Sequence, residues 1–94
     1  MIFIINNLKY DTDKMELVSE TCKHKYKSES MLGAFYFTGK DVKLWKSSKG
    51  NWLLTYNTDY NSCGKTIDES EAKNLLLQYD LEKYEELFGE LEEA

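Results

Sequence analysis

The hydrophobic pattern of this chain changes near residue 66, from short β-type runs to the wider spacing of helices. The segment from Asp68 to Glu71 marks the change, because an acceptor residue followed three positions later by glutamate is the pattern of a helix capping box. A helix is therefore predicted to begin here. Its apolar positions, at helical spacing, are Ala72, Leu75, Leu76 and Tyr79.

Asp80 can cap a second helix. Gly89 is a residue that ends or weakens a helix, so the second helix is expected to be short or interrupted there. Its apolar stripe would comprise Leu81, Tyr84, Leu87, Phe88 and Leu91.

Two hairpins are predicted before the helices. One joins Ile2–Ile5 to Leu8–Tyr10 through an Asn-Asn turn pair. The other joins Val42–Lys46 to the aromatic run 52–56 through the loop 47–50, in which Gly50 supplies a positive φ.

The segments between the hairpins are less strongly patterned. Met15–Lys23 fits either a strand or one or two helical turns, and a strand is favoured. Lys25–Ser30 and Asn57–Lys65 are polar and are expected to be loops, and Gly39–Asp41 is expected to be a turn. Ala34–Thr38 is aromatic and β-branched, which predicts a strand.

At 94 residues the chain is expected to form a single domain, residues 1–94, around one core. Residues 1–65 would be mainly β, and residues 66–94 would be helical and acidic. The predicted fold class is α+β: an antiparallel sheet of about four to five strands packed against one or two C-terminal helices.

Charge divides the chain in the same place. Residues 1–65 hold ten lysines and seven acidic residues (+3), whereas residues 66–94 hold two lysines and ten acidic residues (-8), which together give the net charge of -5. A net negative chain without arginine is poorly suited to non-specific nucleic-acid binding. Such asymmetry predicts a molecule with two electrostatically different faces.

The sequence offers no catalytic, metal or cofactor motif, and we expect neither an enzyme nor a cofactor. Cys22 and His24 could share a face of a strand, but a zinc site needs four ligands and only Cys63 remains as a further soft ligand. The five glycines are scattered singly, so no phosphate-binding loop is present. With no signal peptide or membrane span expected, the chain is predicted to be cytoplasmic, with free thiols.

Two surfaces could bind a partner. Lys43, Lys46 and Lys49 lie near Trp45 and Trp52 in the sequence, a mixture that suits single-stranded nucleic acid. Tryptophans in a hairpin are more often core residues, and the core reading is favoured for both. The C-terminal glutamates could instead imitate the phosphate spacing of a nucleic acid, or be a solvated helix face. The predicted partner-binding residues are Glu82, Glu85, Glu86, Glu90, Trp45, Trp52 and Tyr56.

Four segments, taken in order, resemble a family of small proteins encoded by bacterial phages and other mobile elements. They are YDT at 10–12, LWKSSKGNWLL at 44–54, ESEAK at 69–73 and YEELFGELEEA at 84–94. Proteins of this size and origin include inhibitors of bacterial defence systems, anti-CRISPR proteins among them. Residues 23–33 depart from the pattern of the family and are a candidate for partner preference.

The resemblance implies a non-catalytic inhibitor that binds a bacterial defence protein, such as a CRISPR nuclease, and blocks its nucleic-acid-binding groove. The alternative is a small accessory protein that binds single-stranded nucleic acid through the Lys/Trp hairpin. A second copy of the chain is a third candidate partner, through an exposed apolar helix stripe.

Overall fold

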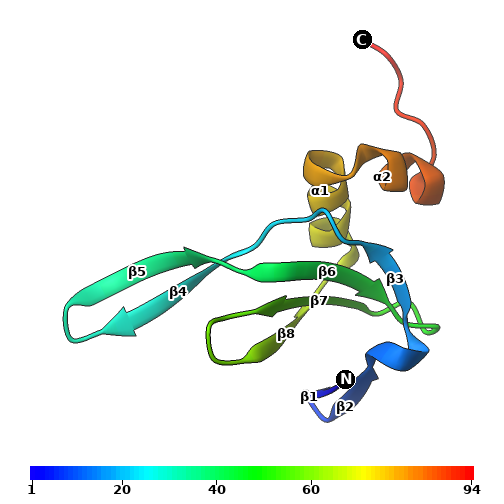
Figure 1. Ribbon diagram of the computed structural model, residues 1–94. Helices are drawn as coiled ribbons and strands as arrows, with labels where there is room; N and C mark the ends of the chain where they lie inside the picture. The colour runs from blue at the N-terminus through cyan, green and yellow to red at the C-terminus, as the bar shows by residue number, and fades with distance from the viewer.

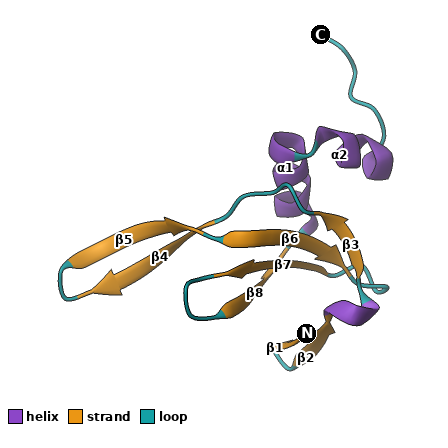
Figure 2. Ribbon diagram, viewed as in Figure 1, coloured by secondary structure: helices purple, strands orange, loops and turns teal.

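Figure 1 shows the computed structural model, which describes residues 1–94. The chain forms an α+β fold of eight antiparallel strands, one 3-10 turn and two C-terminal helices (Figure 2). In chain order the elements are β1 (Ile2–Ile5), β2 (Leu8–Asp11), the 3-10 turn (Thr12–Lys14), β3 (Glu16–Ser19), β4 (Lys25–Ser30), β5 (Gly33–Thr38), β6 (Lys40–Lys46), β7 (Trp52–Asn57), β8 (Ser62–Ile67), α1 (Glu69–Tyr79) and α2 (Leu81–Phe88).

The central sheet contains four strands in the order β3-β6-β7-β8, and every neighbouring pair is antiparallel. The predicted hairpin between β6 and β7 is present. Its loop is closed by the Ser47 N–H donating to the Asn51 carbonyl at 2.8 Å, and Gly50 adopts a φ of 86°. Leu44 then faces Leu54 across the two strands, which places both side chains on the same side of the sheet.

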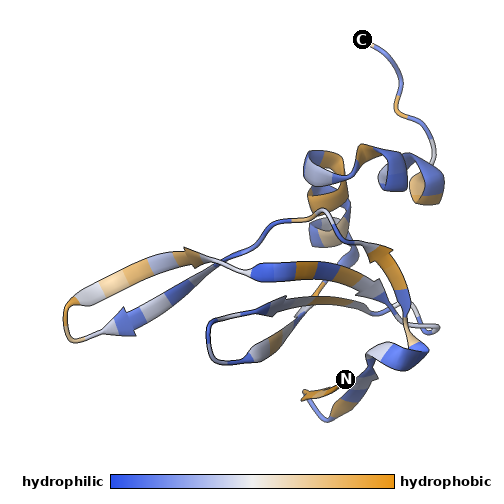
Figure 3. Cartoon of the chain, viewed as in Figure 1, coloured by the Kyte–Doolittle hydropathy of each residue, from blue (hydrophilic) through white to orange (hydrophobic).

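The helices cover that side of the sheet. Leu44 and Leu76 are fully buried, and Trp52 is 3% exposed. Helical spacing in α1 brings Ala72 and Leu76 onto the apolar face of the strands. Figure 3 shows hydrophobic and hydrophilic residues alternating along α1 and along the strands below it. The buried cluster is Val18, Cys22, Val42, Leu44, Trp52, Leu54, Ala72 and Leu76.

The β1–β2 hairpin lies against the opposite side of the sheet (Figure 1). Asn6 and Asn7 take φ values of 52° and 64°, the left-handed conformation that a two-residue hairpin turn requires. The Phe3 ring lies so close to Gly64 that a Cβ on that glycine would be 2.8 Å from ring carbon Cδ1. The sheet therefore has a covered face on both sides, and fully buried Leu53 belongs to the second face.

Both helix caps follow the sequence pattern. The Asp68 carboxylate accepts the Glu71 N–H at 2.7 Å and starts α1, and the Asp80 carboxylate accepts the Lys83 N–H at 3.3 Å and starts α2. Gly89, with a φ of 93°, ends α2. Leu91 therefore lies outside the helix in which the sequence had placed it.

A small polar cluster fixes the junction of the helices to the end of β3. The Ser19 hydroxyl donates to the second carboxylate oxygen of Asp80 at 2.7 Å, and the Thr21 hydroxyl donates to the Tyr79 carbonyl at 3.0 Å. Ser19 is 4% exposed, so its hydroxyl is removed from water and depends on these partners.

The β4–β5 hairpin projects from the rest of the molecule (Figure 1). We call residues 25–38 the arm. Its strands pair with each other and with no other strand, and they help to give the molecule extents of 48 × 33 × 20 Å. The turn at its tip is Met31-Leu32, and the Ser30 hydroxyl accepts the Leu32 N–H at 3.2 Å.

Several local predictions are wrong. Lys25–Ser30 is strand β4 and not a loop, because pairing with β5 satisfies its backbone groups whatever its polarity. β8 occupies much of the predicted loop 57–65, and β6 begins inside the predicted turn 39–41. Within Met15–Lys23, the favoured strand is present only over Glu16–Ser19.

Candidate interaction surfaces

The acidic end of the chain is a surface of carboxylates with few cations. Glu82 and Glu86 are exposed on α2, and Glu85 is half-buried. The Lys83 ammonium lies 3.3 Å from the Glu86 carboxylate and forms the one ion pair of this segment. From Leu81 to Ala94 the chain holds six glutamates against that single lysine.

The predicted helical spacing holds for only part of this surface. Glu82 and Glu86 are four residues apart on α2 and so lie on one side of the helix. Glu90 follows the helix end and cannot continue the row, which corrects its assignment to a helix face. Glu92 and Glu93 also follow the helix, in the terminal segment that has no regular structure.

Trp52 cannot anchor a partner. Its side chain is 3% exposed and packs beneath α2, with its ring centroid 6.4 Å from that of Phe88. Strand alternation explains the burial, because Trp52 and Leu54 project to the same side of β7 as the helices. The core alternative for this tryptophan is confirmed, and its assignment to a binding surface is wrong.

Trp45 and Tyr56 are half-buried and lie on opposite faces of the sheet. The Trp45 indole N–H donates to the Thr55 hydroxyl at 2.9 Å, on the face covered by the β1–β2 hairpin. Tyr56 packs between the rings of His24 and Tyr26, with centroid distances of 4.6 and 5.7 Å. Trp45 therefore lies on the face of the sheet opposite to α2 and its glutamates.

The Lys/Trp hairpin is also divided by strand alternation. Lys43 and Trp45 project to one face of β6, whereas Lys46 projects to the other, where its ammonium lies 5.2 Å from the Trp52 ring centroid. Lys43 is further engaged with Glu20 at 3.9 Å. These residues do not form the continuous basic and aromatic surface that binding of a single strand requires.

The arm carries a large exposed apolar surface that was not predicted from the sequence. Met31 and Leu32 at its tip are 105% and 89% exposed, and Tyr36 is 71% exposed. Phe35 and Phe37 are each 47% exposed. The signal was three consecutive aromatic residues without the alternation of a half-buried strand, close to a Met-Leu turn.

A ladder of rings joins the arm to the sheet. Phe37 stacks on Tyr26 within the arm at 5.8 Å, and Tyr26 stacks on Tyr56 of β7. His24 completes the ladder, and its pKa is lowered by removal from water and by the nearby Lys65 ammonium. Removal from water also raises the pKa of the Tyr56 hydroxyl, with Cys63 contributing. The base of the arm is thus a packed joint.

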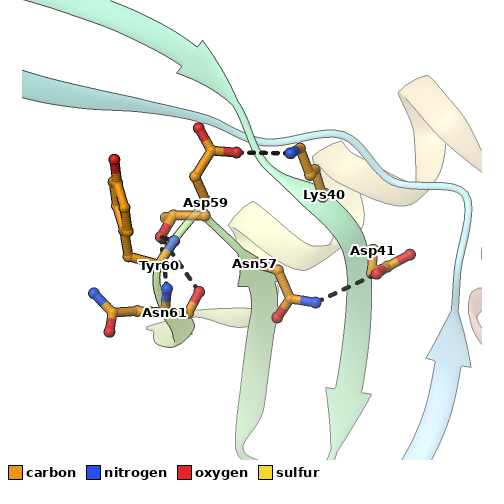
Figure 4. Close-up of polar contacts among 7 residues, drawn as sticks. Lys40, Asp41, Asn57, Asp59, Tyr60 and Asn61 are labelled. Carbon is orange, nitrogen blue, oxygen red and sulfur yellow. Dashed lines mark hydrogen bonds and ion pairs between the residues drawn. The ribbon is translucent and has the colours of Figure 1, made fainter.

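Polar contacts connect the start of β6 to the end of β7 and to the loop between β7 and β8 (Figure 4). The Lys40 ammonium donates to the Asp59 carboxylate at 2.7 Å, which raises the pKa of Lys40, and the Asn57 amide donates to Asp41 at 3.3 Å. Tyr60, at the tip of this loop, is 93% exposed and its ring points away from these contacts.

Cys22 and His24 do not form the pair that the sequence allowed. They lie in the connection between β3 and β4, where Cys22 is buried in the core and His24 packs on Tyr56. Burial raises the pKa of the Cys22 thiol, which donates to the Ser19 hydroxyl at 3.7 Å. Cys63 is also free, and no three His, Cys, Asp or Glu side chains gather in a cluster that could hold a metal ion.

Neither helix has the length and hydrophobicity that a membrane span requires. Comparisons of the chain with protein-family models, with curated proteins and with solved structures found no match.

Proposed function

We propose that this protein is a non-catalytic inhibitor that acts in the cytoplasm of a bacterial cell. It binds a defence effector of the CRISPR nuclease kind and blocks the groove in which that effector holds nucleic acid. The choice of target class rests on the resemblance to small phage and mobile-element proteins. The mode of action rests on the charge of the C-terminal segment.

The observation that carries the proposal is the exposed negative charge on the outer side of α2. Glu82 and Glu86 extend from the exposed side of a helix whose other side packs on the core through Tyr84 and Phe88. Side-chain pairs four apart on a helix lie about 5–6 Å from one another, comparable to the spacing of phosphates along a strand. A basic groove would therefore meet a row of negative charge on a rigid support.

Electrostatic attraction of this kind has a recognisable dependence on salt. Charges that meet across a wet interface accelerate association, and their effect falls as ionic strength rises. The inhibitor is expected to act stoichiometrically and to lose affinity with added salt. An apolar interface would show much weaker dependence.

The test is inhibition of target-DNA cleavage by a panel of purified, guide-loaded CRISPR nucleases, after a pull-down from host lysate has identified which effector is retained. Reversing both exposed charges in Glu82→Lys/Glu86→Lys is expected to weaken binding by about ten- to a hundredfold, corresponding to roughly 1.4 to 2.7 kcal/mol. Glu85 is left unchanged in this variant because its side chain is half-buried.

The matched control is Asp13→Lys/Glu16→Lys, which changes the net charge equally at exposed positions outside the helices. It is expected to retain inhibition. Equal inhibition by the wild type and Glu82→Lys/Glu86→Lys would contradict the proposed mode, and turnover of any substrate would contradict the non-catalytic assignment.

A further inference from the structure

The two edges of the arm differ in their protection against pairing with another chain. β4 carries Lys25, Lys27 and Glu29 along its edge, and charges of this kind oppose the addition of a further strand. β5 reads Gly-Ala-Phe-Tyr-Phe-Thr and carries neither a charge nor a proline. An exposed strand of this composition is a ready template for strand pairing.

The arm also lacks the support that a hairpin of its size needs. Two isolated strands are marginally stable in water, and stability requires a third strand or a packed face. Here β4 and β5 pair only with each other, and every residue of the arm except Tyr26 is exposed. A further strand along β5 would supply both the missing hydrogen bonds and the missing packing.

The sequence of β5 is complementary to itself. When two copies of the strand are placed antiparallel with Tyr36 opposite Tyr36, each Phe35 faces the Phe37 of the other copy, and each Ala34 faces Thr38. Opposed residues share a face of the sheet, so all four phenylalanines lie on the same side as both Tyr26 rings. Such an arrangement has the two-fold symmetry of most homodimers.

We propose that a second copy of this chain binds the arm, with the two β5 strands paired antiparallel about Tyr36. The dimer contains a four-stranded sheet in the order β4-β5-β5-β4. The lysines of the two β4 strands lie on its outer edges, about 14 Å apart across three strand spacings. At that separation salt screens their repulsion, because the Debye length is about 8–10 Å.

The exposed apolar side chains of the arm set an upper limit on the apolar area that such a dimer can bury. At about 200 Å² for a fully exposed large side chain, the exposed fractions of its five apolar residues correspond to roughly 700 Å² for each protomer. A standard interface buries about 800 Å² on each partner. The five residues are Met31, Leu32, Phe35, Tyr36 and Phe37.

The first test is the molar mass in solution, measured by sedimentation over the micromolar concentration range. The wild type is expected to reach twice the monomer mass of 11.0 kDa. Tyr36→Lys places two lysines opposite each other at the symmetry axis and is expected to remain monomeric, whereas Tyr60→Lys, at another exposed tyrosine, is expected to dimerise. A wild-type chain that stays monomeric would overturn the proposal, as would a dimer that Tyr36→Lys leaves intact.

Cross-linking tests the register by the formation of a bond, so a variant that simply fails to fold cannot imitate the expected result. In a Cys63→Ser background, Tyr36→Cys is expected to form an interchain disulfide, because opposed residues in antiparallel strands have Cα atoms about 4.5–5.5 Å apart, within the range a disulfide spans. Ala34→Cys and Thr38→Cys are each expected to fail alone and to cross-link when mixed. Cross-linking of Thr38→Cys to itself, or no cross-link at Tyr36→Cys, would contradict this register.

This inference stands apart from the proposed function. Glu82→Lys/Glu86→Lys is expected to leave the dimer mass unchanged, because those residues lie outside the arm. Tyr36→Lys reports on dimerisation alone, so the failure of one proposal is distinguishable from failure of the other.

Discussion

The central sheet and the arm are both antiparallel β-structure, but they bury their side chains very differently. β7 places Trp52, Leu53 and Leu54 in succession out of water, because the helices cover one face and the β1–β2 hairpin covers the other. β5 also carries three consecutive large residues, and all three are exposed. Similar strand composition therefore serves stability where both faces are covered and remains free for recognition where neither is.

The largest expected change in stability comes from comparing a leucine of the core with a leucine of the arm. Leu76→Ala removes a fully buried side chain from the core and is expected to lower the free energy of unfolding by about 2–5 kcal/mol. Leu32→Ala, at 89% exposure on the arm, is expected to change it by less than about 0.5 kcal/mol. Urea unfolding in dilute solution measures both, and equal losses would show that the arm belongs to the core.

A smaller change in stability is expected from disturbing the packing of the β1–β2 hairpin on the central sheet. Gly64→Ala would place a methyl group 2.8 Å from the Phe3 ring, which forces the hairpin to shift. We expect a loss of about 1–3 kcal/mol in unfolding experiments. The double variant Phe3→Leu/Gly64→Ala is expected to recover part of this loss, since a smaller side chain leaves room for the methyl group. Strict additivity would argue against the contact.

The smallest effect concerns the joint between the two regions. His24 has a pKa below its ordinary value of 6.5, mainly because it is removed from water, so the unfolded chain binds a proton more readily than the folded one. Its contribution to stability is full above that ordinary value and is lost as the pH falls through the folded pKa. Between about pH 7 and pH 5, His24→Gln is expected to show less loss of stability than the wild type. Parallel curves from urea titrations would refute this.

The sequence predicted the parts of the fold that depend on local pattern. The caps at Asp68 and Asp80, the Asn-Asn turn and the loop before Trp52 are fixed by residues close in the chain, and each is present. β4 was missed because a polar strand with no alternation is recognisable only from its partner, which is β5. The partner of a strand is a long-range property that composition does not reveal.

The same distinction explains the candidate surfaces. The acidic residues of α2 could be read from the sequence, since an exposed helix face follows from spacing. The burial of Trp52 could not be predicted in the same way, because it depends on which face of the sheet the helices cover. The exposure of Phe35 and Phe37 depends on the absence of any covering element, and no short segment of sequence records that absence.

Asp80 links regions of the chain that are made at different times. One oxygen of its carboxylate starts α2, and the other holds Ser19, which precedes it by 61 positions. During synthesis α2 emerges after β3, and its direction depends on the contact of Asp80 with Ser19 at the end of that strand. The negative surface of α2 is therefore oriented relative to the sheet only once β3 is in place. If the sheet is incomplete or misfolded, α2 and its glutamates have no fixed orientation.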